Sequence, residues 1–335
     1  MQAQLIALDW GTTSLRAYKL GAAGAVLDQR GLSYGIMALP DTPRIIHGQL
    51  CEDRFELAFD EACGDWLDAQ PGIAVIACGM VGSAQGWQEV PYCPTPTQVS
   101  GLGSQLQRLR SRRGVDVHLV PGVIQRSRLP NVMRGEETQV LGVLEDLPAE
   151  RRDAPLLIGL PGTHSKWVQV IEGRIEHFDT FMTGEVYGLL CAHSILGRTQ
   201  QRSEHFDLQA FDCGVQVALS DAGDLGVLSN LFSARTLGLT GQLSGAEQGD
   251  YLSGLMIGHE LRAVAQAQRR QSAGAQLPEV VLIGSDALCQ RYQRALADVG
   301  FSAVSQAPQA TERGLWSLAC AAGLVTSSFK DLRHA

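Results

Sequence analysis

The chain has 335 residues, of which 45% are hydrophobic and 19% are charged, and its formal net charge is −8. This composition is typical of a folded globular protein, and the length is sufficient for two domains with separate cores. The excess of acids, and the shortness of the basic patch at 108–113, argue against a nucleic-acid partner. We expect that patch to be the solvated face of a helix.

Membrane and disulfide signals are missing from the sequence. No apolar run reaches the roughly 20 residues of a membrane-spanning helix, and the first expected strand begins too close to Met1 for a signal peptide. The eight cysteines are scattered, without a Cys-x-x-Cys pair or metal-ligand spacing. Most, including Cys78 and Cys191, are expected to be small buried hydrophobic residues. The sequence therefore predicts a protein of the reducing cytoplasm with no membrane partner.

Hydrophobic patterns typical of strands and helices follow one another along the chain. Strands are expected at 5–9, 15–20, 25–32, 73–78, 115–120, 156–160, 167–171, 178–182, 280–285 and 301–305. Helices are expected at 55–67, within 132–144, and at 185–196, 206–219, 225–237, 251–270, 287–299 and 311–325. Residues 40–50 are expected to be a loop. A polar stretch bounded by prolines, 148–155, indicates a boundary between domains at 1–150 and 151–335.

The opening stretch combines a strand, an acid and a turn rich in hydroxyl groups. An apolar run ends at Asp9, Gly11 follows, and a second run returns, which predicts an antiparallel hairpin. Gly11 lets a ligand approach the backbone, and the amides and hydroxyls of Thr12 and Thr13 are available to phosphate oxygens. Asp9 is suited to holding Mg²⁺ through water. The alternative is that Asp9 and Gly11 only shape the turn.

Two further segments of the first half carry polar groups at the ends of elements. The strand 73–78 runs directly into a glycine-bearing loop, 79–87, and ligands of α/β sheets commonly bind at such carboxyl ends. Gly135 precedes Glu136 and Glu137 in the first turn of the next helix, where the helix dipole favours negative charge.

The second half begins with a pattern like that of the first. The strand 156–160 is followed by a turn containing Gly162 and Thr163, by Lys166 and by a return strand. Two halves that each begin with such a hairpin indicate a duplicated architecture. A later strand, 280–285, ends in Gly-Ser before a helix.

In this order the loops resemble those of sugar kinases in the actin, hexokinase and heat-shock ATPase superfamily. Asp9-x-Gly-Thr-Thr-x-x-Arg16 is similar to the first phosphate loop, Gly159-x-x-Gly-Thr163 to the second, and Leu282-Ile-Gly-Ser-x-x-Leu288 to the adenosine loop. Along essentially its whole length the chain also resembles the 2-dehydro-3-deoxygalactonokinases. The stretches that carry this narrower resemblance are 8–14, 77–83, 132–139, 160–167, 180–185 and 193–198.

The resemblance implies an α/β fold of two ribonuclease H-like domains, as in actin-like ATPases, with a central cleft. The first domain would carry the first phosphate loop and the sugar-acid site. The second would carry the second phosphate loop and the adenosine loop, and the last helix would return to the first domain. The implied activity is transfer of phosphate from ATP, with Mg²⁺, to the 6-hydroxyl of 2-dehydro-3-deoxy-D-galactonate in galactonate catabolism.

The resemblance also assigns residues to the nucleotide and the metal. Asp9 would hold the metal. The phosphate-binding residues would be Gly11, Thr12, Thr13, Gly162 and Thr163. The adenosine-binding residues would be Gly284, Ser285 and Leu288.

Three residues are candidates for the catalytic step. The attacking hydroxyl must lose a proton to a carboxylate, and Glu136, with Glu137 second, occupies the place of the base in related kinases. Their alternative role is that of ordinary first-turn acids that stabilise the helix. Lys166 would add a positive charge near the γ-phosphate, or would be an exposed strand lysine. His164 has no evident partner in the sequence and is expected to be structural.

The acceptor is a 2-keto acid, and the arginine fork suits a carboxylate best. Arg134, beside the expected base, is one candidate, and Arg16 and Arg198 are further ones, although Arg16 could instead pair on the return strand. The residues expected to touch the sugar are Gly82, Ser83 and Trp87. Ordinary packing is the alternative for Trp87.

Three other functions remain open. The chain could phosphorylate another sugar acid, such as 2-keto-3-deoxygluconate, or it could be a non-catalytic ATP-gated binding module of the same fold. A polyphosphate phosphatase of this fold would be expected to show more cationic residues. The sequence leaves nucleotide preference and oligomeric state open.

Overall fold

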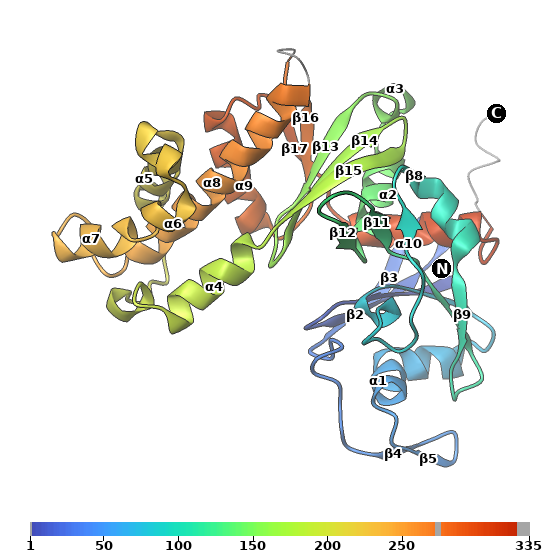
Figure 1. Cartoon of the computed structure of the whole chain (residues 1–335). Helices are drawn as coiled ribbons and strands as arrows, with labels where there is room; N and C mark the ends of the chain where they lie inside the picture. The colour runs from blue at the N-terminus through green and yellow to red at the C-terminus, as the bar shows by residue number, and fades with distance from the viewer. Residues whose placement is uncertain (1, 272–275, 327–335) are drawn as a thin grey trace. The chain divides into compact units, whose positions relative to one another are not determined.

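The computed structural model describes residues 2–271 and 276–326, and these form two compact units (Figure 1). The first unit comprises residues 2–154, 170–177 and 309–326, and the second comprises 155–169 and the described part of 178–308. The last helix of the described chain therefore belongs to the first unit. No helix within the described ranges is both long and apolar enough to cross a membrane.

The first unit is built on a six-stranded sheet. In spatial order its strands are β3 (Val26–Leu32), β2 (Leu15–Leu20), β1 (Leu5–Trp10), β6 (Ala74–Gly79), β10 (Asp116–Leu119) and β9 (Gln107–Arg110). β1 pairs antiparallel with β2 and parallel with β6, and β10 continues the parallel part. Every residue of β1 except Asp9 is buried. The strand therefore carries one partly accessible acid at its carboxyl end.

Short elements complete this unit. β11 (Val123–Gln125) pairs with β12 (Asn131–Met133) and β7 (Cys93–Pro94), and β4 (Arg44–Ile46) pairs with β5 (Gln49–Cys51). The remaining short pieces are β8 (Thr97–Gln98), α3 (Ala149–Arg152), and the 3₁₀ helices η1 (Ala22–Gly24), η2 (Met80–Gly82) and η3 (Val99–Gln105).

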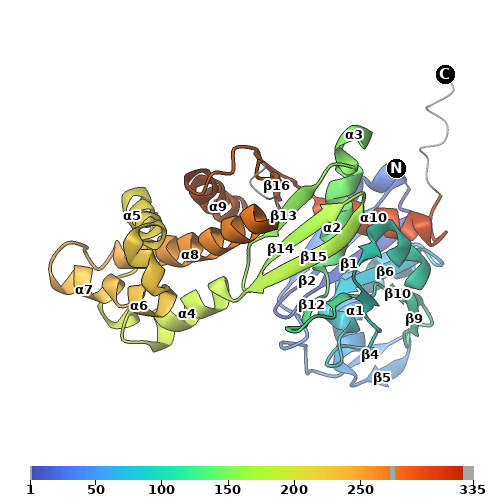
Figure 2. The ribbon, with the colours of Figure 1, turned by 45° about the horizontal axis from the view of Figure 1, so that its top comes forward.

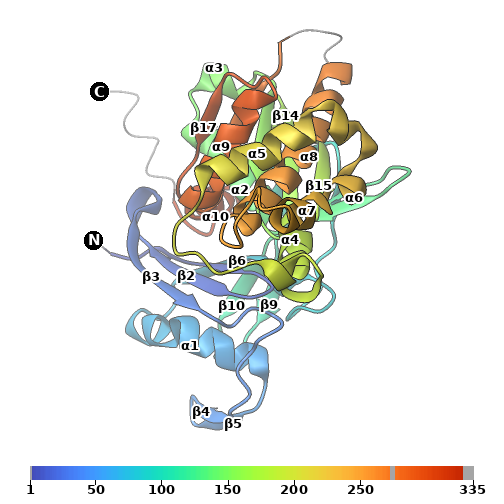
Figure 3. The same ribbon diagram turned by 90° about the vertical axis from the view of Figure 1, so that its left-hand side faces the viewer.

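Helices cover both faces of the first sheet. α1 (Arg54–Ala69) lies on one side, and α10 (Ala310–Ala321) lies on the other with α2 (Glu136–Asp146) (Figures 1 and 3). Asp53 is the N-cap residue of α1, and its carboxylate accepts hydrogen bonds from the first-turn amides of Phe55 and Glu56. α2 and α10 approach closely because a Cβ at Gly142 would overlap the carbonyl oxygen of Ala310.

The second unit is built around a second sheet. In spatial order it contains β17 (Val304–Gln306), β16 (Glu279–Leu282), β13 (Leu156–Leu160), β14 (Ser165–Ile171) and β15 (Arg174–Phe181), after which β8 pairs with β15. β13 pairs parallel with β16, and β16 pairs parallel with β17. The ends of β14 and β15, residues 170–177, belong to the first unit.

A group of helices follows β15 in the second unit. They are α4 (Thr183–His193), η4 (Gly197–Thr199), α5 (Leu208–Leu219), η5 (Asp221–Leu225), α6 (Val227–Asn230), α7 (Ser233–Leu239), α8 (Gln248–Gln271) and α9 (Asp286–Asp298). Figure 2 shows α8 running from the sheet to the group formed by α4 to α7. α5 packs closely on α8, because a Cβ at Gly254 would overlap the carbonyl oxygen of Phe211.

The two units repeat one strand order. The series β3-β2-β1-β6-β10 in the first corresponds to β15-β14-β13-β16-β17 in the second. In each series the two strands of the predicted phosphate hairpin are neighbours, β1 with β2 and β13 with β14. The prediction of two ribonuclease H-like α/β units is confirmed.

Three local expectations are wrong. Residues 40–50 are not all loop, because β4 and β5 form a small hairpin. The single helix expected at 225–237 is instead two short helices, α6 and α7. The first starts only at Val227, because Gly226 has a φ of +84° that helical residues do not adopt. Cys191 is half-buried rather than buried.

The basic patch at 108–113 is not a helix face. Arg108 and Arg110 lie on the edge strand β9, where Asp116 of β10 pairs with both guanidinium groups. The side chain of Arg113 is 6% exposed, and its guanidinium pairs with Asp60 at 2.8 Å. Acids of the same unit therefore pair with Arg108, Arg110 and Arg113. The expectation of no nucleic-acid partner stays a prediction.

The contact between α2 and α10 gives a test of this packing. Gly142→Ala forces a Cβ into the carbonyl of Ala310 and should lower the free energy of unfolding by about 1–3 kcal/mol. The matched control is Gly188→Ala in α4, where a Cβ meets nothing within 4 Å, and a change of at most about 1 kcal/mol is expected, in the stabilising direction. Urea unfolding of both variants measures the difference, and equal midpoints would contradict the packing described.

Candidate functional site

The turn between β1 and β2 is tight and open to solvent on its hydroxyl side. The amide of Gly11 donates to the carbonyl of Ser14 at 2.9 Å. Thr12 and Thr13 are exposed, whereas the backbone of Thr12 is packed against Gly35, where a Cβ would overlap it. The residues predicted for the first phosphate loop therefore lie together on a turn whose backbone packs against Gly35 and whose threonine side chains are exposed.

Asp9 lies at the end of β1 beside this turn. Its side chain is 20% exposed, and Arg16, its partner in the ladder, places a guanidinium nitrogen 3.6 Å from its carboxylate. Burial raises the pKa of Asp9, Arg16 lowers it, and the nearby carboxylates of Glu136 and Glu312 raise it further. A cation at this point would relieve the repulsion between these acids, so Asp9 fits the predicted role of metal ligand.

Glu312 was not found from the sequence. It lies in the first turn of α10, about 300 positions after Asp9 along the chain, and reaches Asp9 because α10 packs on β1. No sequence signal distinguishes Glu312 from an ordinary first-turn acid. In the described residues, no group of three His, Cys, Asp or Glu side chains is arranged to hold a metal ion.

The start of α2 abuts the end of β6. A Cβ at Gly135 would lie 3.2 Å from the Cα of Gly79, and Gly135 has a φ of +110°. Glu136 is half-buried, and its carboxylate accepts from the amide of Arg134 at 3.0 Å. β1 and β6 are parallel neighbours, so their carboxyl ends lie side by side. Asp9 lies at the end of β1, and Glu136, at the start of α2, is close enough to raise its pKa.

Glu137 differs from its neighbour because it is fully buried. Its carboxylate accepts from the amide of Gly135 at 2.7 Å and from the hydroxyl of Thr138 at 3.2 Å. Burial, and then the negative charge of Glu136, raise the pKa of Glu137 to about 8. Of the two predicted bases, only Glu136 has an accessible side chain.

Arg134 is buried beside the loop that follows β6. Its Nη2 donates to the carbonyl of Val90 at 2.7 Å, and its guanidinium carbon lies 4.2 Å from the ring centre of Tyr92. A Cβ at Gly82 would lie 3.0 Å from its Nη1. Neither Nε nor Nη1 has a hydrogen-bond partner in the described part of the chain, and the same is true of the buried hydroxyl of Ser83.

Trp87 is part of an aromatic cluster. Its ring is stacked on Phe55 at 6.2 Å between centres and meets the rings of Trp10 and Phe59 at 5.8 and 5.4 Å. These contacts account for Trp87 by packing, which was the alternative to sugar contact. Arg198, the further arginine candidate, lies exposed in η4 of the second unit.

The turn predicted to be the second phosphate loop packs against the start of α4. A Cβ at Gly184 would overlap the carbonyl of Gly162, and the amide of Glu185 donates to the carbonyl of Thr163 at 3.0 Å. His164 pairs with the carboxylate of Glu185, a partner that was not evident in the sequence.

Lys166 is not an exposed strand lysine. It is 5% exposed, and its ammonium group donates to the carbonyl of His164 at 3.4 Å. The side chain therefore folds back toward the second phosphate turn.

The adenosine loop meets the second phosphate turn. A Cβ at Gly284 would lie 3.4 Å from the carbonyl oxygen of Pro161, and Ser285 occupies the N-cap position of α9 without a side-chain capping hydrogen bond. A cavity of about 280 Å³ joins residues of both loops. Its walls are Gly162, Thr163, Thr183, Gly184, Tyr187, Ser253, Met256, Ile257, Leu288, Arg291 and Tyr292. Of the nucleotide-binding residues predicted in the second half, Gly162, Thr163 and Leu288 line this cavity, whereas Gly284 and Ser285 do not.

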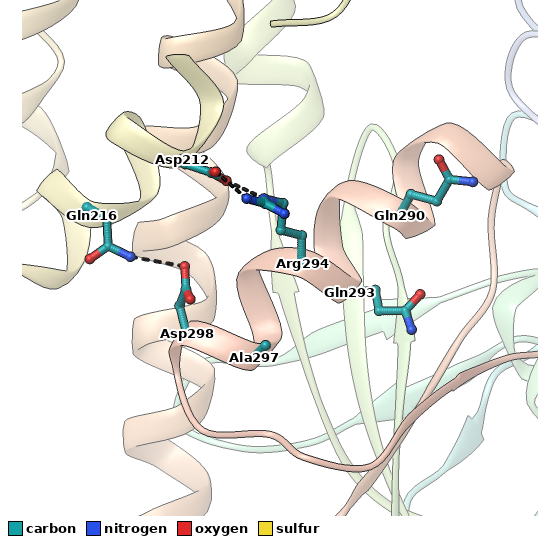
Figure 4. A pocket seen from close by; sticks show the side chains of 7 residues that line it. All are labelled: Asp212, Gln216, Gln290, Gln293, Arg294, Ala297 and Asp298. Carbon is teal, nitrogen blue, oxygen red and sulfur yellow. Dashed lines mark hydrogen bonds and ion pairs between the residues drawn. The ribbon is translucent and has the colours of Figure 1, made fainter. Parts of the chain in front are cut away.

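A larger hollow of about 600 Å³ lies between α5 and α9 (Figure 4). Its charged groups are already paired, since Arg294 binds Asp212 and the amide of Gln216 donates to Asp298 at 3.1 Å. None of the predicted site residues lines it.

Comparison with known families matches residues 9–318 to the model of 2-keto-3-deoxy-galactonokinase. The chain belongs to this family. Two relatives that bear this family's activity in their names each share 32% identity with the chain over nearly their whole length. One, from Rhizobium meliloti (strain 1021), is named a probable 2-dehydro-3-deoxygalactonokinase and aligns over 93% of this chain and 97% of its own. Another, the 2-dehydro-3-deoxygalactonokinase of Escherichia coli (strain K12), aligns over 95% and 98%.

A solved structure agrees with this assignment. A crystal structure from Sinorhizobium meliloti that bears the same family name superimposes with a TM-score of 0.77 at 31% identity, covering 95% of this chain and 98% of that one. The family membership confirms the predicted enzyme class, a carbohydrate kinase that uses ATP.

The burial of Glu137 predicts a pH dependence of stability. The unfolded protein loses the Glu137 proton near pH 4.5 and the folded protein near pH 8, so unfolding becomes easier as pH rises between these values. In Glu137→Gln this loss disappears. The stability of the variant relative to the wild type should rise with pH, with a slope approaching about 1.4 kcal/mol per pH unit. Urea unfolding between pH 5 and 8 measures it.

The control for this experiment is Glu145→Gln, an exposed glutamate of the same helix. This variant should shift the free energy of unfolding without changing its slope against pH. Parallel profiles for Glu137→Gln and the wild type would contradict the assignment.

Proposed function

We propose that this protein phosphorylates the 6-hydroxyl of 2-dehydro-3-deoxy-D-galactonate with MgATP in galactonate catabolism. The observation that carries the proposal is the meeting of Asp9 and Glu136 at the carboxyl ends of β1 and β6, with the open turn at Thr12 and Thr13 beside them. Phosphoryl transfer depends on positioning of the phosphate, on neutralisation of its charge and on a proton acceptor. The turn, a metal at Asp9 and the carboxylate of Glu136 would meet these three needs.

Glu136 is the general base in this proposal. It is accessible, lies at the start of α2, and is close enough to Asp9 to affect its pKa. Glu137 is the next residue of α2 and is fully buried. Because the pKa of Glu137 is about 8, this second carboxyl group stays protonated at neutral pH and adds no charge beside the base.

Mg²⁺ is the metal of this proposal, and Asp9 is the residue that would hold it. Magnesium in kinases is commonly bound by one or two carboxylates together with substrate phosphates and water, so a cage of three protein ligands is not needed. When bound, the ion would neutralise charge on the transferring phosphate. Thr12, Thr13 and the amides of their turn would bind phosphate oxygens.

The second unit binds the rest of the nucleotide in this proposal. Gly162 and Thr163 would contact phosphates, and Gly284, Ser285 and Leu288 would contact the adenosine. The support is the shared cavity of about 280 Å³ and the contact of Gly284 with Pro161. Lys166, folded toward the turn, would add positive charge to it.

Glu136→Gln tests the base. It keeps the side-chain size and should lower kcat by at least about 100-fold, with little change in the dissociation constant for ATP. Coupled ADP release is measured with MgATP and 2-dehydro-3-deoxy-D-galactonate, and a blank without sugar acid measures ATPase activity. Glu145→Gln on the same helix is the control and should keep wild-type kcat. Full activity of Glu136→Gln would remove Glu136 from the mechanism.

Arg134 is the proposed receptor for the substrate carboxylate. Its Nε and Nη1 are the unpartnered N–H groups beside Gly82, and Ser83 adds an unpartnered hydroxyl in the same loop. Arg16 is already paired with Asp9 and is the weaker candidate. A carboxylate that reached Arg134 would satisfy donors that are otherwise buried without partners.

Arg134→Lys should therefore raise KM for the sugar acid by about tenfold or more, because lysine cannot replace the planar fork. The matched control is Arg30→Lys. Arg30 also lies 4.2 Å from a ring centre, that of Trp66, but pairs with Asp65 on the surface. KM for the sugar acid should not change in that variant. Equal KM values in the two variants would exclude Arg134 as the receptor.

Two alternatives are separated by the same assay. Equal ADP release with 2-keto-3-deoxygluconate would keep the kinase and remove the stereochemical preference. Tight ATP binding without ADP release for either acid would favour the binding module. We place the reaction in the cytoplasm, because all eight cysteines are free thiols, as is typical of a reducing compartment.

A further inference from the structure

A buried carboxylate in the second unit has no part in the proposed chemistry. Glu260 lies in α8 and is 3% exposed. One of its oxygens accepts from the indole N–H of Trp167 at 2.7 Å. The other accepts from the hydroxyl of Tyr292 at 2.9 Å and from the hydroxyl of Thr183. Ser165 extends the network, with its hydroxyl 3.1 Å from that of Tyr292.

The three donors come from the elements that carry the predicted nucleotide residues. Trp167 lies in β14, directly after the second phosphate turn. Thr183 begins α4 and precedes Gly184, which packs on that turn. Tyr292 lies in α9, the helix that follows the adenosine loop, and both Thr183 and Tyr292 line the cavity of about 280 Å³.

A carboxylate in this position is costly, which indicates a role beyond filling space. Burial raises the pKa of Glu260, and the hydrogen bonds from Thr183, Trp167, Tyr292 and Ser165 lower it. The two oxygens of Glu260 accept hydrogen bonds from all three donors, which directs these donors toward one point. An apolar side chain would fill the same volume without fixing these directions.

We propose that Glu260 is a positioning residue for nucleotide binding, which holds the second phosphate turn, the start of α4 and α9 in one arrangement. The inference rests on the proposed function, because that function places the nucleotide at these elements. Glu260 itself does not touch the nucleotide. It acts through Trp167, Thr183 and Tyr292.

The test compares Glu260→Met, which removes the acceptor, with Glu260→Gln, which keeps one acceptor oxygen. The dissociation constant for ATP is measured by calorimetry on the full-length protein, with KM for the sugar acid alongside. Glu260→Met should weaken ATP binding by about tenfold or more and change KM for the sugar acid less than about twofold. Glu260→Gln should restore most of the affinity. Its amide oxygen can accept from Trp167, and the hydroxyls of Thr183 and Tyr292 can turn to accept from its amide N–H.

Glu56→Met is the matched control. Glu56 is also a buried glutamate, 4% exposed, but it lies in α1 of the first unit and accepts from the amide of Arg112. This variant should lower the stability and leave ATP binding unchanged. Wild-type ATP affinity in folded Glu260→Met would overturn the inference. If Glu260→Met does not fold, Thr183→Val and Tyr292→Phe each remove one donor, and unchanged affinity in both would overturn it equally.

A further variant separates failure of this inference from failure of the proposed function. Gly184→Ala forces a Cβ into the carbonyl of Gly162 and moves the phosphate turn directly. If Gly184→Ala weakens ATP binding and Glu260→Met does not, only the role of Glu260 is wrong. If neither weakens binding, the nucleotide does not bind at this turn, and both the inference and that part of the proposed function fail.

Discussion

The close approach of two glycines at the edge of the first sheet is the constraint on which the first unit depends. Gly79 ends β6 with a φ of +93°, and a Cβ there would lie 2.6 Å from the carbonyl oxygen of Trp10. Gly135 begins α2 directly against Gly79. Because neither residue has a side chain, the start of α2 reaches the carboxyl ends of the strands, and Glu136 comes within electrostatic range of Asp9.

The second unit reaches a comparable arrangement by other means. Its sheet has the same strand order, but the elements around its phosphate turn are joined through a buried side chain. Glu260 accepts hydrogen bonds from residues of β14, α4 and α9, in addition to the backbone contact between Gly184 and Gly162. The second unit therefore adds a buried side-chain network to the kind of close backbone contact found in the first.

The two adjacent glutamates at the start of α2 differ in burial. Glu137 is fully buried and carries its proton at neutral pH, whereas Glu136 is accessible and lies near Asp9. Two neighbouring glutamates in one helical turn thus have different environments. This is the condition under which one carboxylate of a pair can act as a base while the other stays neutral.

The sequence by itself determined the features that depend on neighbours along the chain. The apolar strands β1 and β13, the glycine turns after them and most of the helices have local patterns, and their repetition predicted the duplicated fold. The family resemblance had the same basis, because its motifs are short continuous stretches.

Only the tertiary structure decided which side chains meet across the fold. Glu312 comes within electrostatic range of Asp9 because α10 packs on β1, His164 pairs with Glu185 because α4 begins at the predicted phosphate turn, and Arg113 pairs with Asp60. The accessibility of Glu136 and the burial of Glu137 likewise depend on the packing of α2. Burial and through-space charge are properties of the packed chain, and they leave no trace in a local pattern of residue types.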